Sequence, residues 1–214
     1  MRSVGSLIPN IDAAQRPTVA SGVMTTSART RPWTRVEYER LIEIGVFRAG
    51  EPVELLGGQL IVSEPQGSAH YTAVLLAEEA LRASLGAGWL VRTQGPIALD
   101  DESEPEPDIA AVPGRARDYS RAHPVRPALV VEVAETTLAH DRAYKGSLYA
   151  RARVDDYWIV NLIDRVLEVY RQPIPDAAAP FGWRYASKQV LDPPSSVTPL
   201  AVAGARIVVS DLLP

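Results

Sequence analysis

The stretch EPEPDIAAV, residues 104–112, places three carboxylates just before a short apolar run. Glu104, Glu106 and Asp108 occupy alternate positions, and Pro107 restricts the backbone directly before Asp108. A fourth acid, Glu132, interrupts the run PALVVEVAE, which is otherwise apolar, as is typical of a strand buried on both faces. Burying an unpaired carboxylate costs several kcal/mol, so Glu132 predicts a cation beside it.

Asp108 and Glu132 could form one site. If their strands pair side by side, both carboxylates point at the same place, where they repel each other unless a positive charge lies between them. Hard divalent cations such as Mg²⁺ prefer oxygen ligands of this kind. Together with a nearby lysine, the two acids would form a metal-dependent centre that cleaves phosphodiesters. The metal would polarise the phosphate and activate water, and the ammonium would steady the water or the developing charge.

Simpler interpretations of these acids remain open. The stretch EPEPDI could be a charged surface loop, because short motifs alone are weak signals. Glu132 could face water from an edge strand. Within the functional interpretation Asp108 is the working carboxylate, and Glu104 and Glu106 are expected on a solvated loop or in an electrostatic supporting role.

Three segments predict helices. Residues 31–45 combine a capping-box spacing at Thr34 and Glu37 with a glycine at the end. Residues 68–88 place apolar side chains at helical spacing and also end in glycines. Residues 138–153 follow two threonines that can cap a helix.

Strands are predicted between these helices and after them. Glu54 lies in a hairpin around Gly57-Gly58, because this dipeptide supplies the positive φ angles of a tight turn. The other predicted strands lie within residues 89–100, 107–112, 127–135, 155–172, 181–190 and 205–210. The order of elements indicates the α/β or mixed α+β class, with a mixed sheet flanked by helices.

Composition sets the limits of the functional interpretation. The chain has 214 residues, of which 46% are hydrophobic and 22% charged, which predicts one domain over residues 31–214 after a flexible tail, residues 1–30. The lack of cysteine excludes disulfides, thiolate metal sites and cysteine nucleophiles. A net charge of −4 argues against a protein that coats DNA, and less against a nuclease whose carboxylates bind metal. No membrane-spanning run or secretory signal is evident, so the cytoplasm is the expected location.

An ordered series of motifs resembles a known family. EPD is followed about two dozen residues later by VVEVAETTLAHDRAYKGSLYARARVDDYWIVNL, and WTRVEYERL, VELLGGQLI and SAHYTAVLLAEEAL precede it. This series resembles the Uma-two family of restriction-endonuclease-like proteins, a bacterial branch of the PD-(D/E)XK nuclease superfamily. The resemblance covers roughly residues 32–172 and is much more specific than a single short motif.

The resemblance implies a restriction-endonuclease-like core and a nuclease that uses Mg²⁺, with Mn²⁺ able to substitute, on nucleic acid, with DNA as the expected substrate. It implies Asp108 and Glu132 as metal ligands and Glu54 as a further acid facing the metal. The superfamily usually has its lysine two residues after the strand acid, where this chain has Ala134. The resemblance moves that role to Lys145 on the next helix. Glu135 stands where the family usually has a small serine, which puts the shape of the cleft and the activity in question.

Several of these roles have structural alternatives. Lys145 lies four residues after Asp141 and could form only a helical salt bridge. Glu54 could be a solvated hairpin residue, and His70, at a helix start, could contact substrate or phosphate or be structural. A homodimer is plausible because cleavage of a duplex often needs two active sites. The alternative function is a non-catalytic binding or assembly module that retains the nuclease fold.

Overall fold

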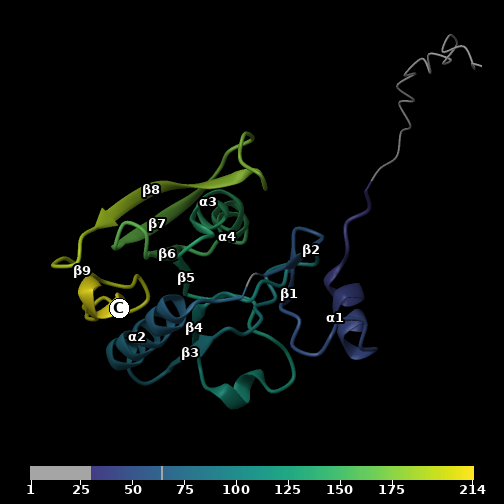
Figure 1. Ribbon diagram of the computed structural model, residues 1–214, viewed down its shortest axis with the longest axis horizontal. Helices are drawn as coiled ribbons and strands as arrows, with labels where there is room; N and C mark the ends of the chain where they lie inside the picture. The colour runs from purple at the N-terminus through teal and green to yellow at the C-terminus, as the bar shows by residue number, and fades with distance from the viewer. Residues whose placement is uncertain (1–29, 64) are drawn as a thin grey trace, which may run out of the picture. The chain divides into compact units, whose positions relative to one another are not determined.

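Six strands form one mixed sheet (Figure 1), in the order β3-β4-β5-β6-β7-β8. Their bounds are Trp89–Thr93, Ile109–Pro113, Leu129–Ala134, Asp156–Asn161, Val166–Pro175 and Trp183–Leu191. Neighbouring strands are antiparallel except β5 and β6, which run parallel. Parallel neighbours need a long crossover, and the chain between β5 and β6 supplies one that contains the third predicted helix. The predicted mixed α/β class is confirmed.

The computed structural model describes residues 30–63 and 65–214. The predicted tail, residues 1–30, lies outside the described residues except for Thr30. Residues Arg31–Pro214 form one compact unit. No helix in the described ranges is long and apolar enough to cross a membrane.

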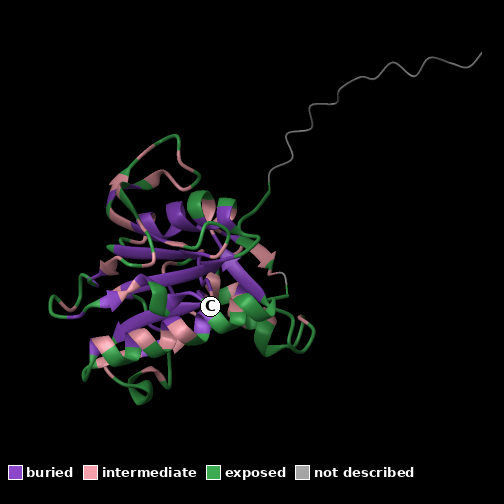
Figure 2. Ribbon diagram, turned by 60° about the vertical axis from the view of Figure 1, so that its left-hand side comes forward, coloured by how far each residue is buried: buried purple, intermediate pink, exposed green. Residues whose placement is uncertain are grey.

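Helices cover both faces of the sheet. Helix α2 (Ser68–Leu85) packs on one face with a C-terminal segment that contains β9 (Ser196–Val197), β10 (Ile207–Val208) and the short helix η3 (Val209–Leu212). Helix α4 (Gly146–Arg151) packs on the other face. Figure 2 shows the central strands buried between these layers. The C-terminal strand predicted over residues 205–210 is shorter than expected, because helix η3 follows β10 directly.

The hairpin predicted around Gly57-Gly58 is present. Strands β1 (Val53–Leu56) and β2 (Gln59–Val62) pair antiparallel, and both glycines adopt positive φ angles, 56° and 78°. A Cβ on Gly58 would lie 2.3 Å from Pro32, which also requires glycine there. The hairpin joins the loop before β4 through a bridge between Leu55 and Glu104.

The first helix also follows its sequence signals. Helix α1 (Arg35–Glu43) begins with the predicted capping box, in which the Glu37 amide donates to the Thr34 hydroxyl and the Thr34 amide donates to the Glu37 carboxylate. The aromatic ring of Tyr38 packs under Trp33 and Val53, which holds the helix against the hairpin.

The segment predicted as the third helix is irregular. It consists of one helical turn, α3 (Leu138–His140), the π-helical turn η2 (Asp141–Lys145) and helix α4. The carbonyl of Asp141 accepts hydrogen bonds from the Gly146 amide, one residue beyond the α-helical partner, and from the Tyr157 hydroxyl at 2.9 Å. Such π-helical turns occur frequently at functional sites.

Candidate active site

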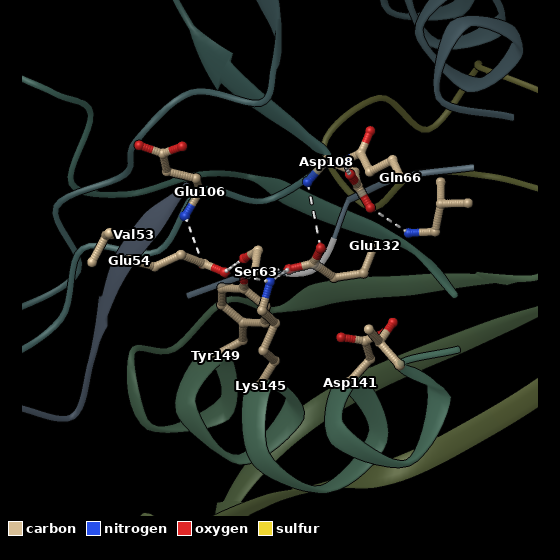
Figure 3. Close-up of polar contacts among 12 residues, drawn as sticks. Val53, Glu54, Ser63, Gln66, Glu106, Asp108, Glu132, Asp141, Lys145 and Tyr149 are labelled. Carbon is tan, nitrogen blue, oxygen red and sulfur yellow. Dashed lines mark hydrogen bonds and ion pairs between the residues drawn. The ribbon is translucent and has the colours of Figure 1, made fainter. Parts of the chain in front are cut away.

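Asp108 and Glu132 meet where β4 and β5 pair. Ile109 lies opposite Val131 in this antiparallel pair, so Asp108, just before β4, lies opposite Glu132 on β5. The Asp108 amide lies 3.4 Å from Glu132 Oε2, and the Val133 amide donates to Asp108 Oδ2 at 2.8 Å. The two residues are therefore neighbours that line one cleft, and the contact between them joins the Asp108 amide, not its carboxylate, to Glu132 (Figure 3).

Side-chain alternation decides which face of the sheet receives these acids. On β5, Leu129, Val131 and Val133 pack with the core on the α2 side, whereas Val130 and Ala134 pack with the core on the α4 side. Glu132 alternates with the first set and so points toward α4. It is only 3% exposed, which excludes the interpretation as a water-facing edge residue.

Lys145 supplies the cation that the buried strand predicted. Its Nζ lies 3.1 Å from Glu132 Oε1 and 3.4 Å from Glu54 Oε1. Figure 3 shows the side chain rising from η2 between these two carboxylates. Within the described residues Lys145 forms these two ion pairs, and Asp141 instead accepts a hydrogen bond from the Thr137 hydroxyl. The interpretation of Lys145 as only a helical salt bridge to Asp141 therefore does not hold.

Glu54 is buried and its two oxygens have separate partners. Ser63 Oγ donates to Oε1 at 3.0 Å, and the Glu106 amide donates to Oε2 at 3.0 Å. The side chain is therefore not a solvated hairpin residue. The hairpin places it on the opposite side of Lys145 from Glu132.

The expectation of a solvated loop for Glu104 is wrong. Its side chain is 2% exposed, because its backbone pairs with Leu55 and its carboxylate faces Arg35, with 3.9 Å between the nearest atoms. Burial, reinforced by the charge of Glu39, raises the pKa of Glu104 to about 7. Glu106 is half-buried, and its carboxylate points away from Lys145 (Figure 3) while its amide holds Glu54.

The imidazole of His70 contacts the carboxylate of Asp108, one of the two predicted metal ligands. Its Nε2 lies 3.2 Å from Asp108 Oδ2. Burial opposes protonation of the imidazole, but the hydrogen bond and charge of Asp108 outweigh it and raise the pKa of His70. The first turn of α2 therefore orients Asp108, and a substrate contact for this histidine stays a prediction.

These side chains line a cleft of about 500 Å³. Six carboxylates line it, with Lys145, His70 and His140 as the basic groups; the acids are Glu54, Glu106, Asp108, Glu132, Glu135 and Asp141. Glu135, which departs from the family pattern, is exposed and lies near the start of α2, where a Cβ on Gly67 would be 3.1 Å from its Oε2. It adds a negative charge to the rim of the cleft.

The excess of carboxylates changes the protonation of the site. Burial raises the pKa of Glu132, with the Lys145 ammonium opposing this and the charge of Asp108 reinforcing it. Burial also raises the pKa of Asp141, and the charge of Lys145 again acts to lower it. Burial by itself would lower the pKa of Lys145, but Glu132 and Glu54 outweigh it and raise the pKa. The lysine thus stays charged, and one ammonium does not neutralise the acids around it.

The donor set fits a hard divalent cation. Glu132 Oε1 is occupied by Lys145 and by the hydroxyl of Tyr149, whereas among the described residues Oε2 has only the 3.4 Å contact with the Asp108 amide. In residues 30–63 and 65–214 no three acid or histidine side chains converge closely enough to hold a metal ion by themselves. Mg²⁺ commonly binds proteins through one or two carboxylates and keeps several waters. Asp108 and Glu132 are therefore enough protein ligands, of the right chemical type, for one Mg²⁺ ion.

Two polar residues of this site were missed from the sequence. Tyr149 is not among the residues predicted for the site, yet its hydroxyl donates to Glu132 Oε1 at 2.7 Å. Asp141 was considered only as a salt-bridge partner, yet it lines the cleft. Both lie four residues from Lys145 in the sequence, and this helical spacing is the signal that could have identified them.

Comparisons with known proteins identify a family and a shared fold. A family model described as Uma2, "Putative restriction endonuclease", matches residues 35–210. Among solved structures, the chain is similar to the crystal structure of "a putative nuclease belonging to DUF820" from Anabaena variabilis ATCC 29413, with 14% sequence identity and a TM-score of 0.60. The match covers 80% of this chain and 96% of that chain, and it shows a shared fold. No curated protein matches the chain.

Proposed function

The chain belongs to the Uma2 family, and from its cleft we propose that it is a metal-dependent nuclease that hydrolyses phosphodiester bonds, with DNA as the expected substrate. One observation carries the proposal: the Lys145 ammonium lies 3.1 Å from Glu132, whose other oxygen faces the Asp108 amide, and all three side chains line one cleft. An acid pair with a lysine beside it is the arrangement that the phosphodiester-cleaving centre requires. The cleft gives that arrangement access to a substrate.

Asp108 and Glu132 would hold Mg²⁺ or Mn²⁺, and Glu54 would assist from the far side of Lys145. When bound, the cation supplies charge stabilisation to a phosphate and makes a coordinated water more acidic. Lys145 remains an ammonium because the surrounding acids raise its pKa, so it acts as a hydrogen-bond donor and a positive charge. It would steady the attacking water or the charge that develops on the phosphate.

A cleavage assay with purified protein tests this function. Supercoiled plasmid, linear duplex, single-stranded DNA and RNA are each incubated with Mg²⁺, with Mn²⁺ or with EDTA, and nicks are counted separately from double-strand breaks. We expect cleavage that requires the cation. The ratio of breaks to nicks as protein concentration rises would also test whether two copies act together on a duplex.

The alternative function is a binding or assembly module that keeps the fold without turnover. One observation favours it: Lys145 pairs with both Glu54 and Glu132, so the site neutralises part of its own charge. Robust metal-dependent cleavage of any nucleic acid would exclude this alternative. Lack of cleavage with every substrate and cation, in a folded protein, would favour it over the nuclease.

The affinity for Mn²⁺ should rise with pH. The pKa of Glu132 is raised, so in the metal-free protein a proton competes with the cation at this carboxylate. Deprotonation as pH rises through that raised pKa removes the competition, so titration calorimetry should give tighter Mn²⁺ binding at pH 8 than at pH 6. Glu132→Gln should bind weakly at both pH values. Equal affinity of the unaltered protein at both would contradict this role of Glu132.

Tyr149→Phe should weaken Mn²⁺ binding by roughly 10- to 100-fold, the range seen for residues that orient metal ligands. The buried hydroxyl donates to Glu132 Oε1, which leaves Oε2 directed at Asp108. Tyr185→Phe is the matched control, because it removes another largely buried hydroxyl whose acceptor, the Val154 carbonyl, lies outside the cleft. Titration calorimetry measures the Mn²⁺ affinity of both variants. Equal affinities would mean that the Tyr149 hydroxyl does not orient Glu132 and that Tyr149 contributes packing alone.

A further inference from the structure

The connection between β4 and β5 is unusually basic for this chain. Residues 114–127, here called the arginine segment, contain four arginines, Arg115, Arg117, Arg121 and Arg126, and one acid, Asp118. The whole chain carries a net charge of −4. All four arginines are exposed, so the segment forms a local positive surface on an acidic protein.

The arginine segment is held in a defined conformation. The Gly114 amide donates to the Gly88 carbonyl at 2.8 Å, and the Ala98 amide donates to the Pro124 carbonyl at 2.9 Å. Between these anchors a 3₁₀ turn, η1 (Ala116–Tyr119), is closed by the Tyr119 hydroxyl, which donates to the Pro113 carbonyl at 2.6 Å. The segment is therefore a fixed platform for its arginines.

The charges on this platform are not neutralised locally. Across the described residues, none of the four guanidinium groups lies within 4.0 Å of a carboxylate. Asp118 instead accepts a hydrogen bond from the Arg115 backbone amide at 2.8 Å. Guanidinium groups form two parallel hydrogen bonds with phosphate, which makes a cluster of free arginines well suited to a phosphate backbone.

The cleft itself cannot attract such a backbone before a cation binds. Its carboxylates outnumber its basic groups, and like charges repel a phosphodiester. Binding energy for a nucleic acid must therefore come from a surface outside the cleft. Of the connections in the sheet, the one between β4 and β5 joins the strand that directly follows Asp108 to the strand that carries Glu132.

We propose that the arginine segment is the surface that contacts the phosphate backbone of the nucleic-acid substrate, an inference that rests on the proposed nuclease function. Asp108 precedes β4 and the segment follows it, so Asp108 and Gly114 are about 20 Å apart, six residue steps of about 3.4 Å along the strand. That length corresponds to about six nucleotides of one DNA strand at about 3.4 Å each. The strands β4 and β5 are buried, so one nucleic acid would pass over the outside of this strand pair, with its backbone on the arginines and a scissile phosphate at the acids.

The test measures binding without cleavage. A fluorescently labelled DNA duplex is titrated with protein in EDTA, and anisotropy is recorded over a range of salt concentrations. The variant carries Arg→Gln substitutions at all four arginines of the segment. The matched control carries four Arg→Gln substitutions at other exposed sites, Arg40, Arg48, Arg165 and Arg206. Circular dichroism and thermal unfolding verify that both variants fold.

We expect the segment variant to bind at least about tenfold more weakly than the control, with the slope of log K against log salt reduced by about 3 to 4, because each phosphate contact contributes about 0.9. Equal binding by the two variants would overturn the inference while leaving cleavage by the unaltered protein, and so the proposed function, intact. Arginine-dependent binding with no cleavage under any cation would support the arginine surface and contradict the proposed nuclease function. No binding of any nucleic acid, or preferential binding of anionic lipid vesicles, would also overturn it.

Discussion

Asp108→Asn is expected to reduce metal-dependent cleavage by at least about 10³-fold, because each 1.4 kcal/mol of lost charge stabilisation costs about tenfold in rate and a metal supplies several kcal/mol. The substitution keeps the size of the side chain and an oxygen that can accept from the Val133 amide. It removes one of the charges that raise the pKa of Glu132 and also the charge that pairs with His70, so the two effects on the unfolding temperature of the metal-free protein oppose each other and the variant should stay folded.

Glu135→Gln is the matched control for Asp108→Asn. It removes the same charge from the same cleft, but at the exposed rim and away from Lys145. Cleavage by this variant should stay within a few-fold of the original rate, measured with plasmid and Mg²⁺. If Asp108→Asn retained a similar rate, Asp108 would not be a metal ligand, and the proposed centre would be wrong.

Lys145→Met should have the largest effect on stability. It leaves Glu132 and Glu54 buried without their cation, and removal of one partner of a buried ion pair typically costs about 3–5 kcal/mol. Cleavage should fall by roughly 10²- to 10³-fold, as when a donor to a developing charge is removed. The matched control is Lys188→Met, since Lys188 pairs with Glu168 from a side chain that is 40% exposed and Arg142 remains to hold that acid.

The stability loss of Lys145→Met should depend on pH with a definite sign. Without the ammonium, the pKa of Glu132 rises further above its value in the unfolded chain, so the folded state binds the proton more tightly. Stability of the variant should therefore increase as pH falls through that raised pKa, approaching the unaltered protein near pH 5. Urea unfolding at several pH values measures this, and a loss that does not change with pH would show that Lys145 acts by packing alone.

Local signals fixed many of the elements correctly. The capping box at Thr34 and Glu37 and the Gly57-Gly58 turn depend on residues close in sequence, so their conformations follow from short-range sterics and hydrogen bonds. Burial of β5 also followed from composition, because a nearly continuous apolar run is stable only when both faces are covered. From that burial came the correct expectation that Glu132 has a cation beside it.

Other features of the site depend on contacts between distant segments. Glu104 looked solvated because it lies among prolines and acids, but the bridge to Leu55, far away in sequence, covers it. The four-residue spacing of Tyr149 from Lys145 places both on one helix face, but it does not show that the Tyr149 hydroxyl meets Glu132. The π-helical turn was also not visible, because the Asp141 carbonyl finds its second donor on Tyr157 of another strand.

The sequence by itself determined the family, the mixed α/β class and the identity of the residues proposed as the site: Asp108, Glu132, Lys145, Glu54 and His70. Only the tertiary structure decided how they meet. Strand alternation turns Glu132 toward α4, and the pairing of Ile109 with Val131 brings Asp108 beside it, with the Asp108 carboxylate against His70 of α2. The hairpin brings Glu54 to the other side of Lys145. The physical reason is that residue type sets which charges must be compensated, whereas long-range strand and helix packing sets which partner compensates each of them.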